Sequence, residues 1–345
     1  MIDQAVAGGW EHRRACGYLE LDEGRAWRWR RRRDVGCLDD SKPGNAVHGL
    51  RPEEVTEILE LFEAWGDVDR SHRKLAHRGS YLGLVWVSPA TVCRVLAAHG
   101  LVPKRPCRVM RRERRPFPQW ADHRRNSIWI YDVTRFHGCP GHAVFAVMDL
   151  VTRKRICELV SAEETSTQVQ VVFMDALQTE GLLELIEARQ DTPPVDPLSL
   201  DADVDVLPPV LLAVSDNGSQ MTSGSTREFM AMCAIAQHFG RPGTPTDQAW
   251  IESLFSHIKA DWPHLDRIQE PEVLRAELAT DRHEYNTVRL HAGIGHVTPA
   301  DEHDGRGPRI RAARRRGLRH ARWARITYHR IEQAKAKRRS HADEA

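Results

Sequence analysis

The sequence contains no apolar run that approaches the roughly 20 residues needed for a membrane-spanning helix. Its first ten residues, Met1 to Trp10, also lack the basic start and the long apolar core of a secretory signal peptide. These two absences argue against a membrane-embedded or secreted protein. We therefore expect a cytoplasmic protein, nucleoid-associated if it binds DNA, with no membrane partner.

The seven cysteines are odd in number and scattered, and no two of them form a Cys-x-x-Cys pair. The tightest combination of possible zinc ligands is His137 with Cys139, and nothing nearby in the sequence supplies two further ligands. The pattern argues against a disulfide framework and against a zinc site. It is typical of thiols in a reducing compartment.

The net charge of only +2 hides a strong segregation of charge along the chain. Residues 101–125 contain nine Lys and Arg against two acidic residues, and residues 305–345 contain fourteen against three. Residues 180–206 have the opposite balance, with eight acidic residues against one arginine. Basic blocks on both sides of a neutral middle suggest contacts with phosphate groups. The alternative is that each block is a solvated face.

A chain of 345 residues is long enough for two or three domains. Residues 1–44 are predicted to form a short helical basic segment that ends in an arginine-rich stretch over 25–33. There Trp27 and Trp29 alternate with arginines, a pattern suited to presenting guanidinium groups to phosphates. A helix end with a solvated basic face would have the same pattern.

Residues 45–115 are predicted to form an all-α region followed by a basic linker. Apolar residues at helical spacing predict a first helix over 52–65, and shorter helices are predicted over 72–78, ended by Gly79, and over about 89–99. Two short helices after a longer one are compatible with a helix-turn-helix, whose last helix would enter a major groove. An ordinary three-helix bundle would give the same pattern.

From residue 116 to about residue 300 the pattern changes to that of an α/β domain. Apolar runs predict strands, two of them forming a hairpin, and periodic segments predict helices. The expected order is strand 127–134, strand 143–149, strand 155–160, helix 165–178, strand 210–215, helix 225–236 and a helix that contains residue 252. An acidic, proline-rich insertion is expected at about 180–208. The prediction is a mixed sheet covered by helices on both faces, followed by a basic tail over 301–345.

Two predicted strands of this domain end in aspartates, Asp132 and Asp216, and Glu252 lies on the last helix. Open α/β sheets bind ligands at the carboxyl ends of their strands. Three carboxylates at one such end suit a pair of divalent metal ions, because these hard cations prefer oxygen ligands. Asp149 also ends a strand, but a hairpin turn favours Asp in any case, so we interpret it as a turn residue.

Several basic residues are candidate DNA contacts. Lys259 lies two helical turns after Glu252 on the same face, where it could hold a phosphate beside the metal ions, although a solvated lysine is equally compatible with the pattern. The other candidates belong to the helical region, the basic linker, the end of the core and the tail: Arg94, Arg105, Arg111, Arg112, Arg289 and Arg315.

The segments around the carboxylates resemble a known family, the bacterial insertion-sequence transposases with a retroviral-integrase-like catalytic core. The similarity is greatest to the downstream, OrfB-like product of the group that uses two overlapping reading frames. The matching strings are Asp132-Val-Thr, Ser215-Asp-Asn-Gly-Ser-Gln, Arg241-Pro-Gly-Thr-Pro-Thr-Asp, Trp250-Ile-Glu-Ser-Leu-Phe, Tyr285-Asn-Thr-Val-Arg-Leu-His and Thr298-Pro-Ala. One departure is Val214, where the family often has histidine.

The resemblance implies a ribonuclease-H-like core in which Asp132, Asp216 and Glu252 hold two Mg²⁺ or Mn²⁺ ions. It implies cleavage of phosphodiester bonds at the ends of a mobile element, followed by transfer of the 3′-hydroxyl to DNA. The implied partners are double-stranded DNA, further copies of the chain, and an upstream-frame product or frameshift fusion. Two alternatives stay open: a DNA-binding regulator with an inactive core, and a ribonuclease-H-type nuclease without strand transfer.

Overall fold

The computed structural model describes residues 1–34, 36, 47–101, 123–190, 209–216, 218–239, 255–256 and 258–343. Glu252, the basic linker over 102–122 and residues 191–208 of the predicted acidic insertion lie outside these ranges. The chain divides into two compact units. The first comprises Met1–Gly49 together with Arg325–Ala345, and the second comprises Leu50–Ala324.

The first unit begins with three short helices whose contacts use small side chains. Ala15, Cys16 and Ala26 are its buried residues within those helices. Near the end of the chain, His329 contacts the Gly49 carbonyl at 3.0 Å. The three helices are α1 (Ile2–Ala7), α2 (His12–Tyr18) and α3 (Glu23–Asp34).

Three helices open the second unit: α4 (Pro52–Trp65), α5 (His72–Leu82) and α6 (Pro89–Ala98). The Ser88 hydroxyl accepts the Thr91 N–H at 3.2 Å and so caps α6. The prediction that Gly79 ends the middle helix is wrong. Gly79 lies inside α5. The position favours glycine because Val85 packs against it, and a Cβ there would lie 2.8 Å from the valine side chain. The left-handed residue that ends α5 is Gly83, with φ of 74°.

A five-stranded sheet forms the centre of the second unit, with strand order β3-β2-β1-β4-β5. The strands β1, β2 and β3 are antiparallel neighbours, whereas β4 and β5 run parallel to β1. This mixed order is that of a ribonuclease-H-like fold, so the predicted fold class is confirmed. The strands are β1 (Ile128–Thr134), β2 (Ala143–Asp149), β3 (Arg155–Ser161), β4 (Leu211–Ser215) and β5 (Ile235–Phe239).

The fifth strand replaces part of a predicted helix, so the prediction of a helix over 225–236 is wrong at its end. The helix α10 (Gly224–Met232) stops early, and Ala234 takes a left-handed conformation with φ of 52° that reverses the chain. The next five residues then pair with β4. Only Ile235 of this strand is fully buried, so its sequence lacks the continuous apolar run by which β4 was recognised.

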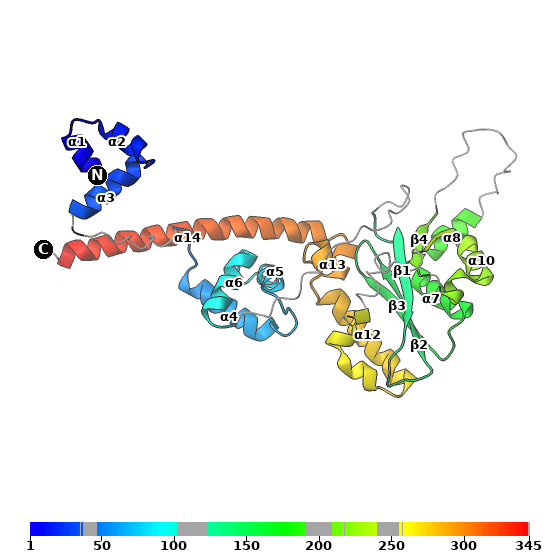
Figure 1. The fold of residues 1–345 in the computed structure, drawn as a ribbon. Coiled ribbons are helices and arrows are strands. Elements are labelled where there is room, and N and C mark those ends of the chain that lie inside the picture. The colour runs from blue at the N-terminus through cyan, green and yellow to red at the C-terminus, as the bar shows by residue number, and fades with distance from the viewer. Residues whose placement is uncertain are drawn as a thin grey trace. The chain divides into compact units, whose positions relative to one another are not determined.

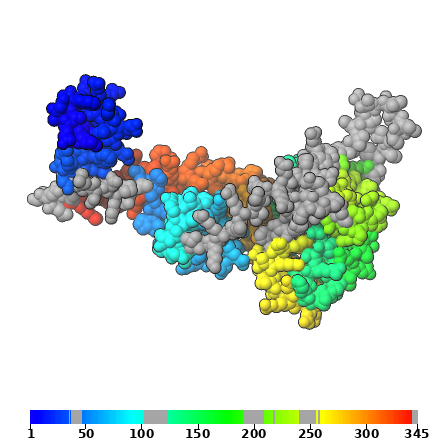
Figure 2. Space-filling view, viewed as in Figure 1, coloured from blue at the N-terminus to red at the C-terminus, as the bar shows by residue number. Residues whose placement is uncertain are grey.

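Helices cover both faces of the sheet (Figure 1). Alternate residues of β1 belong to different cores: Trp129 packs in the cluster that contains Phe173, whereas Ile130 packs in the cluster that contains Leu274 and Leu278. One face carries α7 (Ser166–Thr179), α8 (Leu183–Gln190), α9 (Ser219–Thr222) and α10; the other carries the 3-10 helix η2 (Pro263–Arg267) and α12 (Pro271–Thr287). In the space-filling view the yellow surface around α12 directly adjoins the green surface of the strands (Figure 2).

The predicted basic tail is helical over most of its length. After η3 (Ala292–Ile294) and α13 (Pro299–His303), a single helix α14 runs over Gly307–Asp343. Within the second unit the α4–α6 region is bonded to the core and to α14: Arg78 donates to the Val288 carbonyl at 2.7 Å, and Arg314 donates to Ser80 at 3.0 Å. In the part of the chain that the structure describes, no helix is long and apolar enough to cross a membrane.

Candidate active site at the carboxyl end of the sheet

Two of the three predicted metal ligands lie near the carboxyl ends of neighbouring parallel strands: Asp132 lies two residues before the end of β1, and Asp216 directly follows β4. In the pairing of β1 with β4, Ile130 lies opposite Val214. Asp132 and Asp216 each follow two residues later, so the two carboxylates lie level at the same end of the sheet. Neighbouring strands are about 4.8 Å apart, which brings the two side chains within reach of one ligand.

The same two carboxylates also share a face of the sheet. Ile128 and Ile130 on β1, and Leu212 and Val214 on β4, belong to one hydrophobic core cluster. Side chains two residues apart along a strand point to the same face. Asp132 and Asp216 therefore continue this face beyond the apolar core, where the burial of both side chains falls to intermediate.

Backbone donors hold each carboxylate in place. The Val133 N–H donates to Asp132 Oδ1 at 2.8 Å, and the Gly218 N–H donates to Asp216 Oδ1 at 2.9 Å. A Cβ at position 218 would lie 3.0 Å from Asp216 Oδ1, so glycine lets the turn close onto the carboxylate. Backbone N–H groups from the residues that follow therefore help to orient both aspartates.

Glu252 lies outside the described residues, but the structure describes residues shortly after it, beginning with Phe255. Phe255 and Ile258 are buried in the core cluster of the face that carries Asp132 and Asp216. One residue further, Lys259 Nζ donates to the carbonyl of Arg135 at 2.8 Å, just beyond the end of β1. The chain three residues after Glu252 therefore packs against the same face, and it reaches the same end of the sheet soon afterwards.

The donor chemistry of this edge fits a hard divalent cation. Asp132 and Asp216 supply only carboxylate oxygens, the ligand type that Mg²⁺ and Mn²⁺ prefer. Among the described residues no group of three or more His, Cys, Asp or Glu side chains is arranged to hold a metal ion. A pair of aspartates falls short of that number, and the predicted third ligand, Glu252, is not among the described residues.

The predicted DNA contacts are distributed over several elements. Arg94 on α6 and Arg315 on α14 are exposed. Lys259 also lies over the Phe136 ring, with Nζ 5.2 Å from the ring centroid. Arg105, Arg111 and Arg112 fall outside the described residues.

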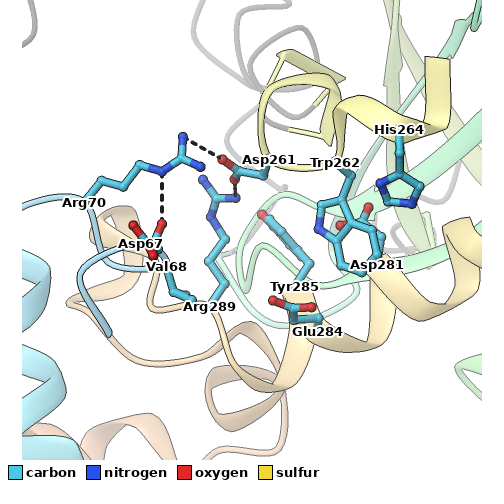
Figure 3. Close-up of a pocket in the computed structure, with 10 residues that line it drawn as sticks. All are labelled: Asp67, Val68, Arg70, Asp261, Trp262, His264, Asp281, Glu284, Tyr285 and Arg289. Carbon is cyan, nitrogen blue, oxygen red and sulfur yellow. Dashed lines mark hydrogen bonds and ion pairs between the residues drawn. The ribbon is translucent and has the colours of Figure 1, made fainter. Parts of the chain in front are cut away.

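Arg289, another predicted DNA contact, lies in an ion pair inside the molecule. It donates to Asp261, which Arg70 also approaches at 3.7 Å. Figure 3 shows these three side chains at the wall of a cavity of about 330 Å³ that Trp262, Tyr285 and His264 also line. These ion pairs join Arg70, in the turn after α4, to Asp261 before α12, and Asp261 to Arg289 after α12. The basic character of Arg289 alone did not predict this structural role.

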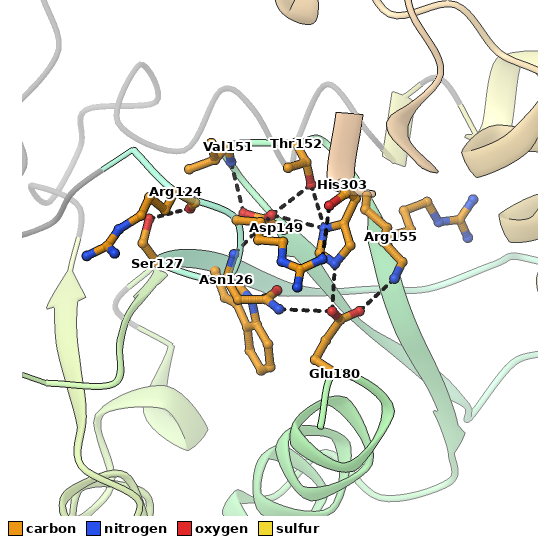
Figure 4. A network of polar contacts seen from close by, with 12 residues as sticks. Arg124, Asn126, Ser127, Asp149, Val151, Thr152, Arg155, Glu180 and His303 are labelled. Atoms are coloured by element: carbon orange, nitrogen blue, oxygen red, sulfur yellow. Dashed lines mark hydrogen bonds and ion pairs between the residues drawn. The ribbon is translucent and has the colours of Figure 1, made fainter. Parts of the chain in front are cut away.

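Asp149, the competing strand-end aspartate, lies at the opposite end of the sheet. Its partner in the antiparallel pairing is Trp129, near the start of β1. Asp149 is fully buried and accepts hydrogen bonds from the Val151 N–H at 3.0 Å and the Thr152 hydroxyl at 2.7 Å (Figure 4). The interpretation of Asp149 as a turn residue therefore agrees with its hydrogen bonds.

A buried histidine joins Asp149 to a second carboxylate. His303 Nδ1 lies 3.4 Å from Asp149, and His303 Nε2 lies 2.7 Å from Glu180 (Figure 4). Burial opposes ionisation of Glu180, but hydrogen bonds from His303, Lys154 and Asn126 outweigh it and lower the pKa of Glu180 to about 2. Burial also opposes protonation of His303, and its hydrogen bonds to the two carboxylates outweigh this effect and raise its pKa.

Comparison with known proteins identifies a protein family over the region that contains the sheet. Two family profiles, both described as integrase core domain, match residues 122–245 and residues 233–299. A transposase for insertion sequence element IS904 from Lactococcus lactis subsp. lactis (strain IL1403) is 23% identical over 182 residues. That match covers 51% of this chain and 60% of the relative, so the chain matches less than two thirds of the relative's length.

Solved structures with some similarity include the catalytic core domain of BIV integrase, which is 18% identical with a TM-score of 0.35. That match covers 52% of this chain and 95% of the other. A simian T-cell lymphotropic virus intasome in complex with PP2A regulatory subunit B56 gamma is 16% identical with a TM-score of 0.38, covering 68% of this chain and 74% of the other.

The two profiles together span every strand of the sheet, both strand-end aspartates and residue 252. The sequence relative is itself an insertion-sequence transposase, the kind of protein whose motifs the chain resembles. The chain therefore carries an integrase core domain and is related to insertion-sequence transposases, which confirms the resemblance in its motifs.

Proposed function

We propose that this chain is a DDE transposase that cleaves phosphodiester bonds at the ends of an insertion sequence and transfers the freed 3′-hydroxyl to DNA. The observation that carries the proposal is the level arrangement of Asp132 and Asp216 on one face of two parallel strands. The burial of Phe255 and Ile258 against that face supports Glu252 as the third carboxylate.

Asp132, Asp216 and Glu252 would hold two Mg²⁺ or Mn²⁺ ions. When bound, these ions would lower the pKa of the attacking water or 3′-hydroxyl and neutralise charge on the leaving oxygen. The backbone N–H groups of Val133 and Gly218 orient the carboxylates, and this restricts the positions that ligand and phosphate can take. The mechanism requires no covalent intermediate with the protein.

DNA would be held by basic residues around this edge. An ammonium group has three donors, and Lys259 uses one of them on the Arg135 carbonyl, which leaves donors for a phosphate oxygen. Because transposition must cut and join two ends together, we also propose that the chain acts as a multimer on DNA. An upstream-frame product or frameshift fusion is a further partner that the sequence resemblance predicts.

The test uses a supercoiled plasmid that carries the chain's own gene with its flanking terminal repeats, incubated with Mg²⁺. Asp132→Asn, Asp216→Asn and Glu252→Gln should each reduce nicking and joining on the order of 10²–10³-fold, because each change removes charge that stabilises the transition state. The matched control is Glu163→Gln, an exposed carboxylate just beyond β3 at the same end of the sheet. It should leave activity unchanged.

Three outcomes would overturn parts of the proposal. Wild-type activity in any of the three variants would remove that residue from the site, and activity that survives EDTA would exclude a metal-dependent reaction. Specific binding to the repeats with no cutting under any metal would favour the DNA-binding regulator. Cutting without joining would favour the nuclease.

A further inference from the structure

The first unit contains a turn with the same closure as the turn between α5 and α6. At the end of α2, Glu20 takes a left-handed conformation with φ of 53°, and the Leu21 N–H bonds to the Cys16 carbonyl at 3.0 Å. At the end of α5, Gly83 has φ of 74°, and the Leu84 N–H bonds to the Gly79 carbonyl at 2.9 Å. In both turns a left-handed residue precedes a leucine that bonds five residues back.

The connection from α2 to α3 is the tighter of the two. Residues 19–22 join the helices, and the Asp22 side chain accepts the Arg25 N–H at 2.9 Å, which caps the start of α3. Ala15 and Cys16 on α2 and Ala26 on α3 are buried, so small side chains let the helices approach. A turn of three or four residues is the connection found in a helix-turn-helix, and here α1 supplies a third helix.

The two faces of α3 use their arginines differently. Arg30 and Arg33 turn toward α1 and both bond to Asp3, so they hold the helix in the bundle. Arg28 and Arg31 are exposed, and no acidic residue among those that the structure describes pairs with them. The outer face of α3 is therefore basic, whereas its inner face packs against the other helices and pairs with Asp3.

Tryptophans on α3 stiffen the basic side chains beside them. The Arg31 guanidinium lies 5.5 Å from the centroid of the Trp27 ring, and the Arg25 guanidinium lies 5.6 Å from that of Trp29. Trp27 remains 56% exposed, which is unusual for so large an apolar side chain unless a partner covers it. A stacked guanidinium loses less freedom when it binds phosphate or a base edge.

We propose that α1–α3 is a second DNA-binding module, with α3 as the helix that enters the major groove of double-stranded DNA. Arg28 and Arg31 contact phosphates and guanine edges, for which arginine forks are suited, and Trp27 packs against the groove. The α5–α6 pair has a similar turn, but α6 carries a single arginine, Arg94. The inference rests on the proposed function only in taking DNA as the ligand.

The experiment measures binding of the full chain to a 30-base-pair duplex from a terminal repeat and to a scrambled duplex, in EDTA and over a range of salt. The variant Arg28→Ala/Arg31→Ala should weaken binding to the repeat at least about tenfold and reduce the log–log salt slope by about one to two, at about 0.9 for each arginine that contacts a phosphate. The preference for the repeat should also fall, because α3 reads base edges. The matched control is Arg227→Ala/Arg275→Ala, which removes two exposed arginines from α10 and α12 and should leave binding unchanged.

Thermal unfolding checks that each variant is folded, and Arg31→Glu gives a second, charge-reversing change that should weaken binding further. Unchanged affinity, salt slope and preference in both variants would overturn the proposal. So would a duplex RNA of the same sequence that competes better than the DNA. Because no cleavage is measured, a chain that binds through α3 but never cuts would overturn the proposed function alone.

Discussion

The two ends of the central sheet carry carboxylates with opposite environments. At one end, Asp132 and Asp216 are half-buried and accept hydrogen bonds from backbone N–H groups beside them. At the other end, Asp149 is 0% exposed, and Glu180 bonds to both His303 and Lys154. Asp132, Asp149 and Asp216 all lie at or within two residues of a strand end, so their position in the sequence does not distinguish them; their burial and the hydrogen bonds described above do.

The difference follows from the cost of burying charge. An ionised carboxylate that has left water must be paired and fully hydrogen-bonded, and removing one partner leaves a buried charge uncompensated. The Asp149 end is therefore committed to holding α13 against the sheet. The Asp132 end is oriented but partly open, as a site for an external cation and phosphate requires.

The largest expected effect is that mutations at the two ends of the sheet change different properties, cleavage activity at one end and stability at the other. Asp132→Asn should reduce cleavage on the order of 10²–10³-fold while the free energy of unfolding changes by less than about 0.5 kcal/mol, since the Asp132 side chain is only half-buried. Asp149→Asn should lower that free energy by about 3 kcal/mol, because it removes a charge from a buried network. Denaturant unfolding and plasmid cleavage, measured on both variants, check this. A destabilised Asp132→Asn or a fully stable Asp149→Asn would contradict the distinction between an open functional site at one end of the sheet and a buried structural network at the other.

The network around His303 should make stability depend on pH in a defined window. The raised pKa of His303 contributes stability that is complete below its ordinary value of 6.5 and is lost as pH rises through the folded value. The lowered pKa of Glu180 contributes stability that is complete above 4.5 and is lost as pH falls toward about 2. His303→Gln should therefore cost most between about pH 4.5 and 6.5 and less at pH 9. The exposed His283→Gln is the control, and unfolding curves at each pH are the measurement.

A pair of stacked histidines should make stability respond to pH in the opposite sense to His303. His77 on α5 stacks on His296, with ring centroids 4.1 Å apart. Burial, and for His77 the neighbouring charge of His296, lower the pKa of each ring to about 4. The unfolded chain then binds protons that the folded chain does not, so stability falls as pH drops from 6.5 toward 4. His77→Phe should flatten this acid loss; a steeper loss in the variant would contradict the pairing.

Local sequence patterns predicted one end of the sheet far better than the other. The apolar runs before Asp132 and Asp216 predicted two strands to within a residue, and both aspartates lie within those local strings. The Asp149 network draws on Glu180 and His303, which are distant in sequence, so no local pattern contains it. The basic run over 305–345 likewise predicted that Arg314 would be solvated or would bind DNA. Instead Arg314 is 8% exposed and donates to Ser80 and to two backbone carbonyls, partners that the local sequence of the run does not contain.

The smallest expected effect tests how precisely the turn at Gly218 positions the Asp216 carboxylate. Gly218 has an ordinary φ of −55°, so alanine strains no backbone there, but its Cβ would lie 3.0 Å from Asp216 Oδ1. Gly218→Ala should shift the Asp216 carboxylate by a few tenths of an ångström and lower the cleavage rate by about tenfold, since displacements near 1 Å can cost about 10²-fold. Stability should barely change. The matched control is Gly224→Ala, where nothing lies within 4 Å of the added Cβ and activity should be retained. Equal cleavage rates in the two variants would show that the turn at Gly218 does not position Asp216 for the reaction.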